Sequence, residues 1–115
     1  MFEKLKEKLG GKTAEKAVKR RIADKLHDVH IKRIAEKGDD GVETIIAREC
    51  HINRLGEKGE ELCATEGVRT VFRAAVDEMR IWEFMSLDGC VIGFVDLDTG
   101  KERNVVVYYD RRLER

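Results

Sequence analysis

The chain has 115 residues, 40% of them charged, and its 23 basic and 23 acidic residues cancel to a formal net charge of +0. This length predicts one domain with a single modest core. No apolar stretch approaches the ~18 residues that a membrane span needs, and the first nine residues lack the apolar core of a secretion signal. We therefore expect a cytoplasmic protein without a membrane partner.

The balanced charge hides a segregation along the chain. Residues 1–37 hold 12 basic and 6 acidic residues, whereas residues 38–115 hold 11 basic and 17 acidic residues. A basic first third on an acidic body fits a nucleic-acid contact or head-to-tail self-association. The plainer interpretation is a solvated helix face, because charge runs most often have that origin.

The first predicted element is a short amphipathic piece at residues 2–9, which ends at Gly10 and Gly11. Adjacent glycines form a flexible joint, so residues 1–11 are predicted to be a short mobile segment ahead of a single domain at residues 12–115. From Ala14 to Lys37 the apolar residues share one wide arc at helical spacing, which predicts a long central helix.

Three further stretches are predicted to be helical: residues 42–55, residues 60–66 and residues 68–85. The last has the clearest helical spacing in the chain, carried by Val68, Val71, Phe72, Ala75, Val76, Met79 and Trp82. Ile81, Phe84 and Met85 lie off this stripe. The end of the helix is therefore expected to meet a second surface.

The clearest signal is a β-hairpin between Cys90 and Asp110. Residues 90–97 and 104–109 form its arms, and Asp98 to Lys101 form its turn, with Gly100 at a position that favours a left-handed backbone. The predicted fold class is α+β: three to four N-terminal helices followed by a C-terminal antiparallel hairpin, packed as one layer of helices on a small sheet.

The arms of this hairpin are apolar on both faces, and a two-stranded hairpin alone is marginal in water. If both of its edges are open, they invite pairing with another chain. We therefore predict a homo-oligomer, most simply a two-fold dimer. The alternative is a monomer whose helices wrap the hairpin. The predicted interface residues are aromatic or apolar: Trp82, Phe84, Phe94, Val106, Tyr108 and Tyr109.

A zinc site is the third hypothesis in order of preference, because the chain contains histidines and cysteines that metal ions favour. The candidate ligands are His27, His30, Cys50 and Cys63. Their spacing is poor, and His30 falls inside an apolar arc, where a neutral histidine bonded to the backbone is the commoner explanation. The three cysteines, counting Cys90, lack a framework spacing and are predicted to be reduced thiols.

A winged-helix DNA binder is the second hypothesis, ahead of the zinc site, because helices followed by a two-stranded wing match the order of elements in that fold. Its candidate contacts are Lys16, Lys19, Arg20, Lys101, Arg103, Arg111 and Arg112. Against it, the recognition helix at residues 68–85 would carry Asp77, Glu78 and Glu83 beside its arginines, whereas a helix on phosphates should be strongly basic.

No motif predicts catalysis. Ser86 is the only serine and lacks a Gly-x-Ser-x-Gly setting, and no glycine-rich stretch has the form of a phosphate loop. The sequence thus favours a small cytoplasmic, non-enzymatic interaction or regulatory protein, such as an accessory protein, an inhibitor or an adaptor. The sequence predicts no cofactor. The protein is expected to bind its partners through the hairpin and the end of the helix at residues 68–85.

Overall fold

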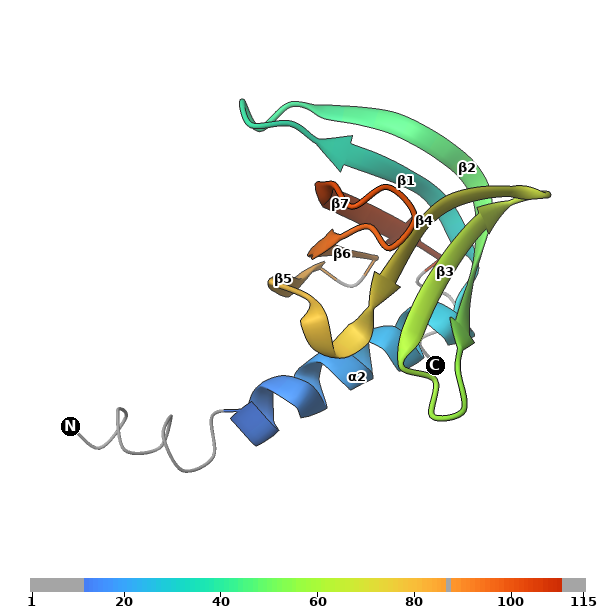
Figure 1. Ribbon diagram of the computed structural model, residues 1–115. Coiled ribbons are helices and arrows are strands. Elements are labelled where there is room, and N and C mark those ends of the chain that lie inside the picture. Colours follow the sequence, from blue (N-terminus) through green and yellow to red (C-terminus); the bar gives the residue numbers. More distant parts are fainter. Residues whose placement is uncertain (1–11, 87, 111–115) are drawn as a thin grey trace.

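The computed structural model describes residues 12–86 and 88–110, and within them one α-helix precedes seven strands (Figure 1). The elements are α2 (Lys12–Asp28), β1 (Ile31–Lys37), β2 (Glu43–Leu55), β3 (Glu61–Glu66), β4 (Arg69–Ala75), the 3-10 helix η2 (Val76–Glu78), β5 (Ile81–Ser86), β6 (Gly89–Val95) and β7 (Glu102–Tyr109). The strands form one antiparallel sheet in the order β4-β3-β2-β1-β7-β6-β5. The predicted mobile segment at residues 1–11 lies outside the described residues.

The predicted α+β arrangement of several helices on a terminal hairpin is wrong, because the protein is mostly β. The predicted helix from Ala14 to Lys37 ends at Asp28, and its last 7 residues are strand β1. Residues 42–55, 60–66 and 68–85 form strands and one 3-10 turn instead of helices. Hydrogen bonds between distant segments outweigh the local helical spacing.

Glycines mark the hairpin turns that separate these strands. Gly41 lies between β1 and β2, Gly56 and Gly59 between β2 and β3, and Gly67 between β3 and β4. All four have positive φ, between 62° and 93°, a conformation that is easy only for glycine. These glycines reverse the chain between neighbouring strands. The helices predicted from the sequence end near the same glycines, which are turns between strands in the structure.

The sheet curls into a half-barrel. Phe72 on β4 and Phe94 on β6 belong to strands far apart in the sheet order, yet their ring centroids are 4.8 Å apart. Strand β2 turns the corner: its first part pairs with β1 and its second part with β3. The change of partner falls between Cys50 and His51. It comes just after Glu49, the one non-glycine residue with positive φ in the described chain (52°).

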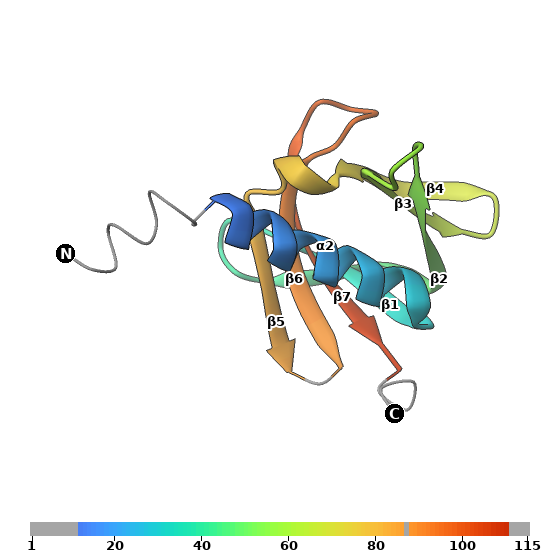
Figure 2. The ribbon, with the colours of Figure 1, turned by 90° about the horizontal axis from the view of Figure 1, so that it is seen from below.

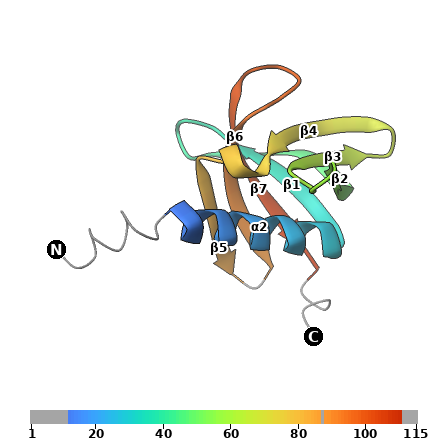
Figure 3. The ribbon, with the colours of Figure 1, turned by 60° about the horizontal axis from the view of Figure 1, so that its bottom comes forward.

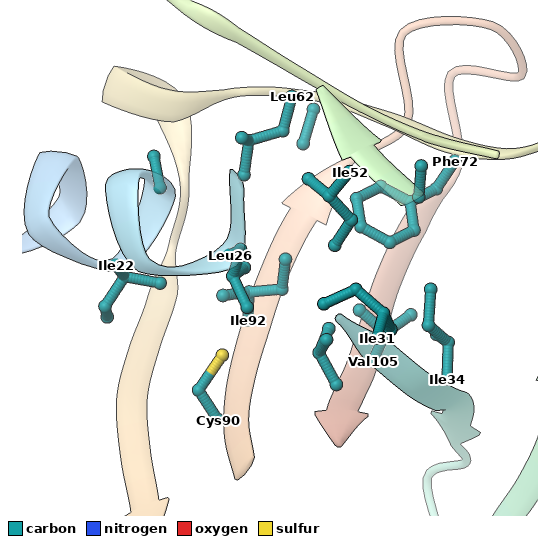
Figure 4. Packing of buried hydrophobic residues seen from close by; sticks show 14 of the residues in the cluster. Ile22, Leu26, Ile31, Ile34, Ile52, Leu62, Phe72, Cys90, Ile92 and Val105 are labelled. Atoms are coloured by element: carbon teal, nitrogen blue, oxygen red, sulfur yellow. The ribbon is translucent and has the colours of Figure 1, made fainter. Parts of the chain in front are cut away.

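Helix α2 lies across the concave side of the curled sheet (Figures 2 and 3). Its buried residues Ile22, Ala23 and Leu26 are fully shielded from solvent and belong to the hydrophobic core. Figure 4 shows Ile22 and Leu26 of the helix beside side chains from the surrounding strands, among them Ile31, Ile52 and Ile92. One helix therefore fills the half-barrel.

The hairpin of β6 and β7 forms as predicted, with Cys90 opposite Val107 and Val95 opposite Glu102. It does not stand at the end of the fold, because β1 pairs with β7 and β5 pairs with β6. Both of its edges are thus occupied within the chain. On the convex face, Val106 is fully buried between its cross-strand neighbours Ala35 and Val91. The described residues contain no second α-helix that could cover this face.

A partly buried ionic cluster closes the curl. The Arg103 guanidinium on β7 donates two hydrogen bonds to the Glu36 carboxylate on β1, of 2.8 and 3.0 Å. The same group donates to Asp96 Oδ2, at 2.9 Å, and to the carbonyl oxygen of Val71 on β4, at 2.9 Å. The hydrogen bonds to Glu36 and Asp96 raise the pKa of Arg103, so it stays a cation. The cluster joins β4 to strands on the other side of the barrel.

Candidate functional site at the free edge of the sheet

The two outer strands of the sheet, β4 and β5, differ in what meets their outer edges. On β4, the carbonyl oxygen of Val71 accepts a hydrogen bond from Arg103, and that of Arg73 accepts one from the amide of Leu97 at 3.0 Å. The contacts that close the half-barrel therefore occupy the outer edge of β4. Backbone groups satisfied in this way are not available to another chain.

Strand β5 pairs with β6 and with no other strand. Arg80, just before it, donates its amide to Gly93 of β6 at 2.7 Å. Within residues 12–86 and 88–110, no hydrogen bond from another element reaches the outer edge of β5. Because peptide groups on an edge strand alternate in direction, about half of those in β5 point away from the sheet. Figure 2 shows β5 at the margin of the sheet.

The side chains along this edge are apolar and exposed. Ile81, Phe84 and Met85 are 43%, 42% and 48% exposed. Natural edge strands are usually protected by lysines, prolines or bulges. In β5 the protection is limited to Glu83 and a register shift between Phe84 and Ser86. An open, apolar edge is the form of surface that recruits another extended chain.

Helix α2 and η2 fix the inner side of β5. The Lys19 ammonium lies 4.4 Å from the ring centroid of Trp82 and donates a hydrogen bond to the carbonyl oxygen of Asp77 at 3.1 Å. Lys19 is only 7% exposed, so this cation–π contact is shielded from water. Arg20 adds an ion pair to the Asp77 carboxylate at 3.2 Å. Trp82 is therefore held against the helix beside the open edge.

The structure separates the predicted interface residues into two groups. Trp82 and Phe84 lie on the free edge strand. Phe94, Val106 and Tyr109 are buried, and Tyr108 donates a hydrogen bond to Glu43 at 2.7 Å and lies under the Arg33 guanidinium. The candidate surface also contains Ile81 and Met85, which the sequence signals by placing them off the helical stripe.

The predicted zinc ligands do not assemble into a site. The His27 ring nitrogen Nδ1 lies 3.2 Å from the carbonyl oxygen of Ile52, and His30 Nε2 lies 2.6 Å from a Glu49 carboxylate oxygen. Cys50 is buried, and Cys63 is partly exposed on the neighbouring strand. Among the described residues, no three histidine, cysteine, aspartate or glutamate side chains gather so that they could hold a metal ion.

The three cysteines are free thiols with weak acidity. Burial raises the pKa of Cys50 to about 11 and that of Cys90 to about 12. Burial also raises the pKa of Cys63. Since the thiolate is the reactive form, each is a weaker nucleophile near neutral pH than a free cysteine.

The winged-helix arrangement is also contradicted, because residues 68–85 form no recognition helix. Of the predicted nucleic-acid contacts, Lys16 and Arg20 are exposed on α2, and Lys101 is exposed in the turn before β7. Lys19 is buried against Trp82, and Arg103 is held in the ionic cluster. Arg111 and Arg112 lie outside the described residues. The five candidates that the structure describes do not form one basic face.

A cavity of about 510 Å³ lies between α2, the turn joining β2 to β3, and η2. Its lining is Val76 together with charged residues of both signs: Arg20, Asp24, Arg54, Lys58, Glu60 and Asp77. Arg20 pairs with Asp77, and Arg54 pairs with Asp24. Three cations thus meet three carboxylates, and the cavity has no charge excess that would select an anion or a cation.

Comparison with known protein families, with curated proteins and with solved structures finds no match for this chain. In the part of the chain that the structure describes, no helix has the length and apolar character needed to cross a membrane.

Proposed function

We propose that this chain is a non-enzymatic cytoplasmic interaction protein whose working surface is the free edge of β5. The observation that carries the proposal is the contrast between the two outer strands. The edge of β4 is occupied by hydrogen bonds from Arg103 and Leu97, whereas no element among the described residues bonds to the outer edge of β5 beside Ile81 and Phe84, each more than two-fifths exposed. The free thiols support the cytoplasmic location, because that compartment keeps cysteines reduced.

The mode of recognition follows from the edge itself. An extended segment that adds to β5 gains main-chain hydrogen bonds, while Trp82 and Phe84 supply side-chain contacts on the concave face. Aromatic residues commonly dominate the binding energy of such contacts. A role as an accessory protein, inhibitor or adaptor needs no catalytic group and agrees with this chemistry.

The test is a selection of short random peptides against the full-length chain, followed by mapping of the bound peptides by NMR. We expect the selected peptides to cause their largest chemical-shift changes in the backbone amides of Ile81–Ser86. The variant Ile81→Lys/Phe84→Lys should weaken their binding by at least about tenfold, or ~1.4 kcal/mol. It alters exposed side chains, so it should leave the fold intact.

The matched control is Val42→Lys/Val68→Lys. It adds the same two positive charges at exposed apolar positions in turns outside β5, where Val42 and Val68 are 60% and 105% exposed. Selected peptides should bind this variant as they bind the parent chain. If no selected peptide contacts β5, or both variants lose binding equally, the proposed surface is wrong.

A further inference from the structure

We propose that the strand that adds to β5 is β5 of a second copy of this chain, antiparallel and related by a two-fold axis, with Trp82 of one copy opposite Trp82 of the other. This inference rests on the proposed function, since it names the partner of the same edge. In the resulting dimer, the sheets of the two half-barrels join into one continuous sheet. Antiparallel addition of identical edges is the geometry that two-fold symmetry permits.

Symmetry limits the registers of such a pair. For the sheet to continue, the axis must run perpendicular to it, so that the two concave faces lie on the same side. Directly opposite residues then share a face of the sheet, and the side chains alternate along the strand. One residue of β5 must therefore lie opposite its own copy on the axis. Trp82 faces Lys19 of α2 and thus the concave side, with Phe84 two residues further on.

Charge and regularity decide between the possible centres. A pair centred on Glu83 places two carboxylates directly opposite each other, which is destabilising. A pair centred on Phe84 runs across the register shift between Phe84 and Ser86. A pair centred on Ile81 requires Met79 to lie opposite Glu83 of the other copy, although Met79 is 2% exposed and part of the core. The pair centred on Trp82 avoids all three conflicts.

The Trp82-centred register also gives favourable contacts. The two indoles form a cross-strand aromatic pair beside the axis. Arg80 of one copy lies opposite Phe84 of the other, where a guanidinium can contact the ring face. Ile81 lies opposite Glu83 of the other copy on the convex face.

The overall charge and size of the protein agree with a second copy as partner. The formal net charge of +0 means that two copies have no long-range repulsion to overcome. The shared edge is short, since β5 has 6 residues. Interfaces at the small end of the range are weak and transient, so the expected dissociation constant is on the order of 10–100 µM.

Disulfide trapping measures this register directly. Directly opposite residues have Cα atoms about 4.5–5.5 Å apart, within the reach of a disulfide. The exposed sites Ile81 and Glu83 are each changed to cysteine in separate proteins, both carrying Cys63→Ser to remove the one native thiol that is not buried. In the proposed register Ile81 faces Glu83, whereas each of these residues is about 8 Å from its own copy.

We expect a mixture of Ile81→Cys and Glu83→Cys proteins to form a mixed disulfide dimer under mild oxidation, while neither protein alone does so. Sedimentation of the parent chain should show a monomer–dimer equilibrium, abolished by Ile81→Lys/Phe84→Lys and kept by Val42→Lys/Val68→Lys. The emission of Trp82, the only tryptophan, should shift to the blue over the same concentrations.

Two outcomes would overturn the inference. A disulfide dimer of Glu83→Cys alone would show that the pair centres on Glu83. A parent chain that stays monomeric to millimolar concentration, with no trapped dimer, would exclude a second copy as the partner. The peptide selection then still decides whether the β5 edge binds another chain, so the two proposals fail separately.

Discussion

Replacement of Arg103 by alanine is expected to lower the free energy of unfolding by about 3–5 kcal/mol, because it leaves the buried Asp96 carboxylate and the partly exposed Glu36 carboxylate without their cation. Asp96 is 2% exposed, and its Oδ2 accepts from Arg103 at 2.9 Å. The change also removes the hydrogen bond that Arg103 donates to Val71 on β4. For a domain whose total stability is about 5–15 kcal/mol, this loss is severe.

The measurement is equilibrium denaturation in urea, with Arg80→Ala as the matched control. Arg80 pairs with Glu102 through side chains that are 61% and 59% exposed, and exposed pairs contribute at most about 1 kcal/mol. Equal losses for the two variants would show that the Arg103 cluster is not what closes the half-barrel.

Replacement of Phe72 by alanine is also expected to lower the free energy of unfolding by about 3–5 kcal/mol, because it leaves a cavity at a fully buried position. The ring of Phe72 also contacts that of Phe94, at 4.8 Å between centroids. A double-mutant cycle with Phe94→Ala should therefore give a coupling of about 0.5–1.5 kcal/mol. Additive effects of the two changes would contradict the contact between β4 and β6, and with it the curl of the sheet.

The hairpin of β6 and β7 could be predicted from the sequence because its signal is local. Strongly β-forming arms flank a turn in which Gly100 has a φ of 73°, as its position in the turn requires. The first half of the long helix could be predicted for the same reason. Its apolar arc from Val18 to Leu26 packs into the concave face of the sheet.

The remaining strands could not be assigned from spacing alone. In residues 68–85 the buried positions of β4, of the turn at Val76 and of the Met79 region fall by coincidence at helical intervals. What distinguishes them is pairing with distant segments, which a local pattern does not contain. The glycines at 41, 56 and 67 are the signal that favours hairpins, because they recur between short segments.

The candidate site was predictable only in part. The sequence predicts Trp82 and Phe84 as interface residues, but on a helix beside an open hairpin instead of on an edge strand. Which strand has a free edge depends on the order of all seven strands. The occupied edge of β4 depends on Arg103, whose partner Glu36 is 67 residues away. Contacts between residues so far apart in the chain cannot be predicted from the local spacing of apolar residues.

Hydrogen exchange of the backbone amides, followed by NMR in dilute solution of the full-length chain, tests the free edge of β5 most directly. The amides of β5 that point away from β6 should exchange orders of magnitude faster than those of β6 and β7, which are paired on both sides. At high concentration the same amides should become protected. If all amides of β5 are as protected as those of β7 in dilute solution, the edge is already covered and the account of its function is wrong.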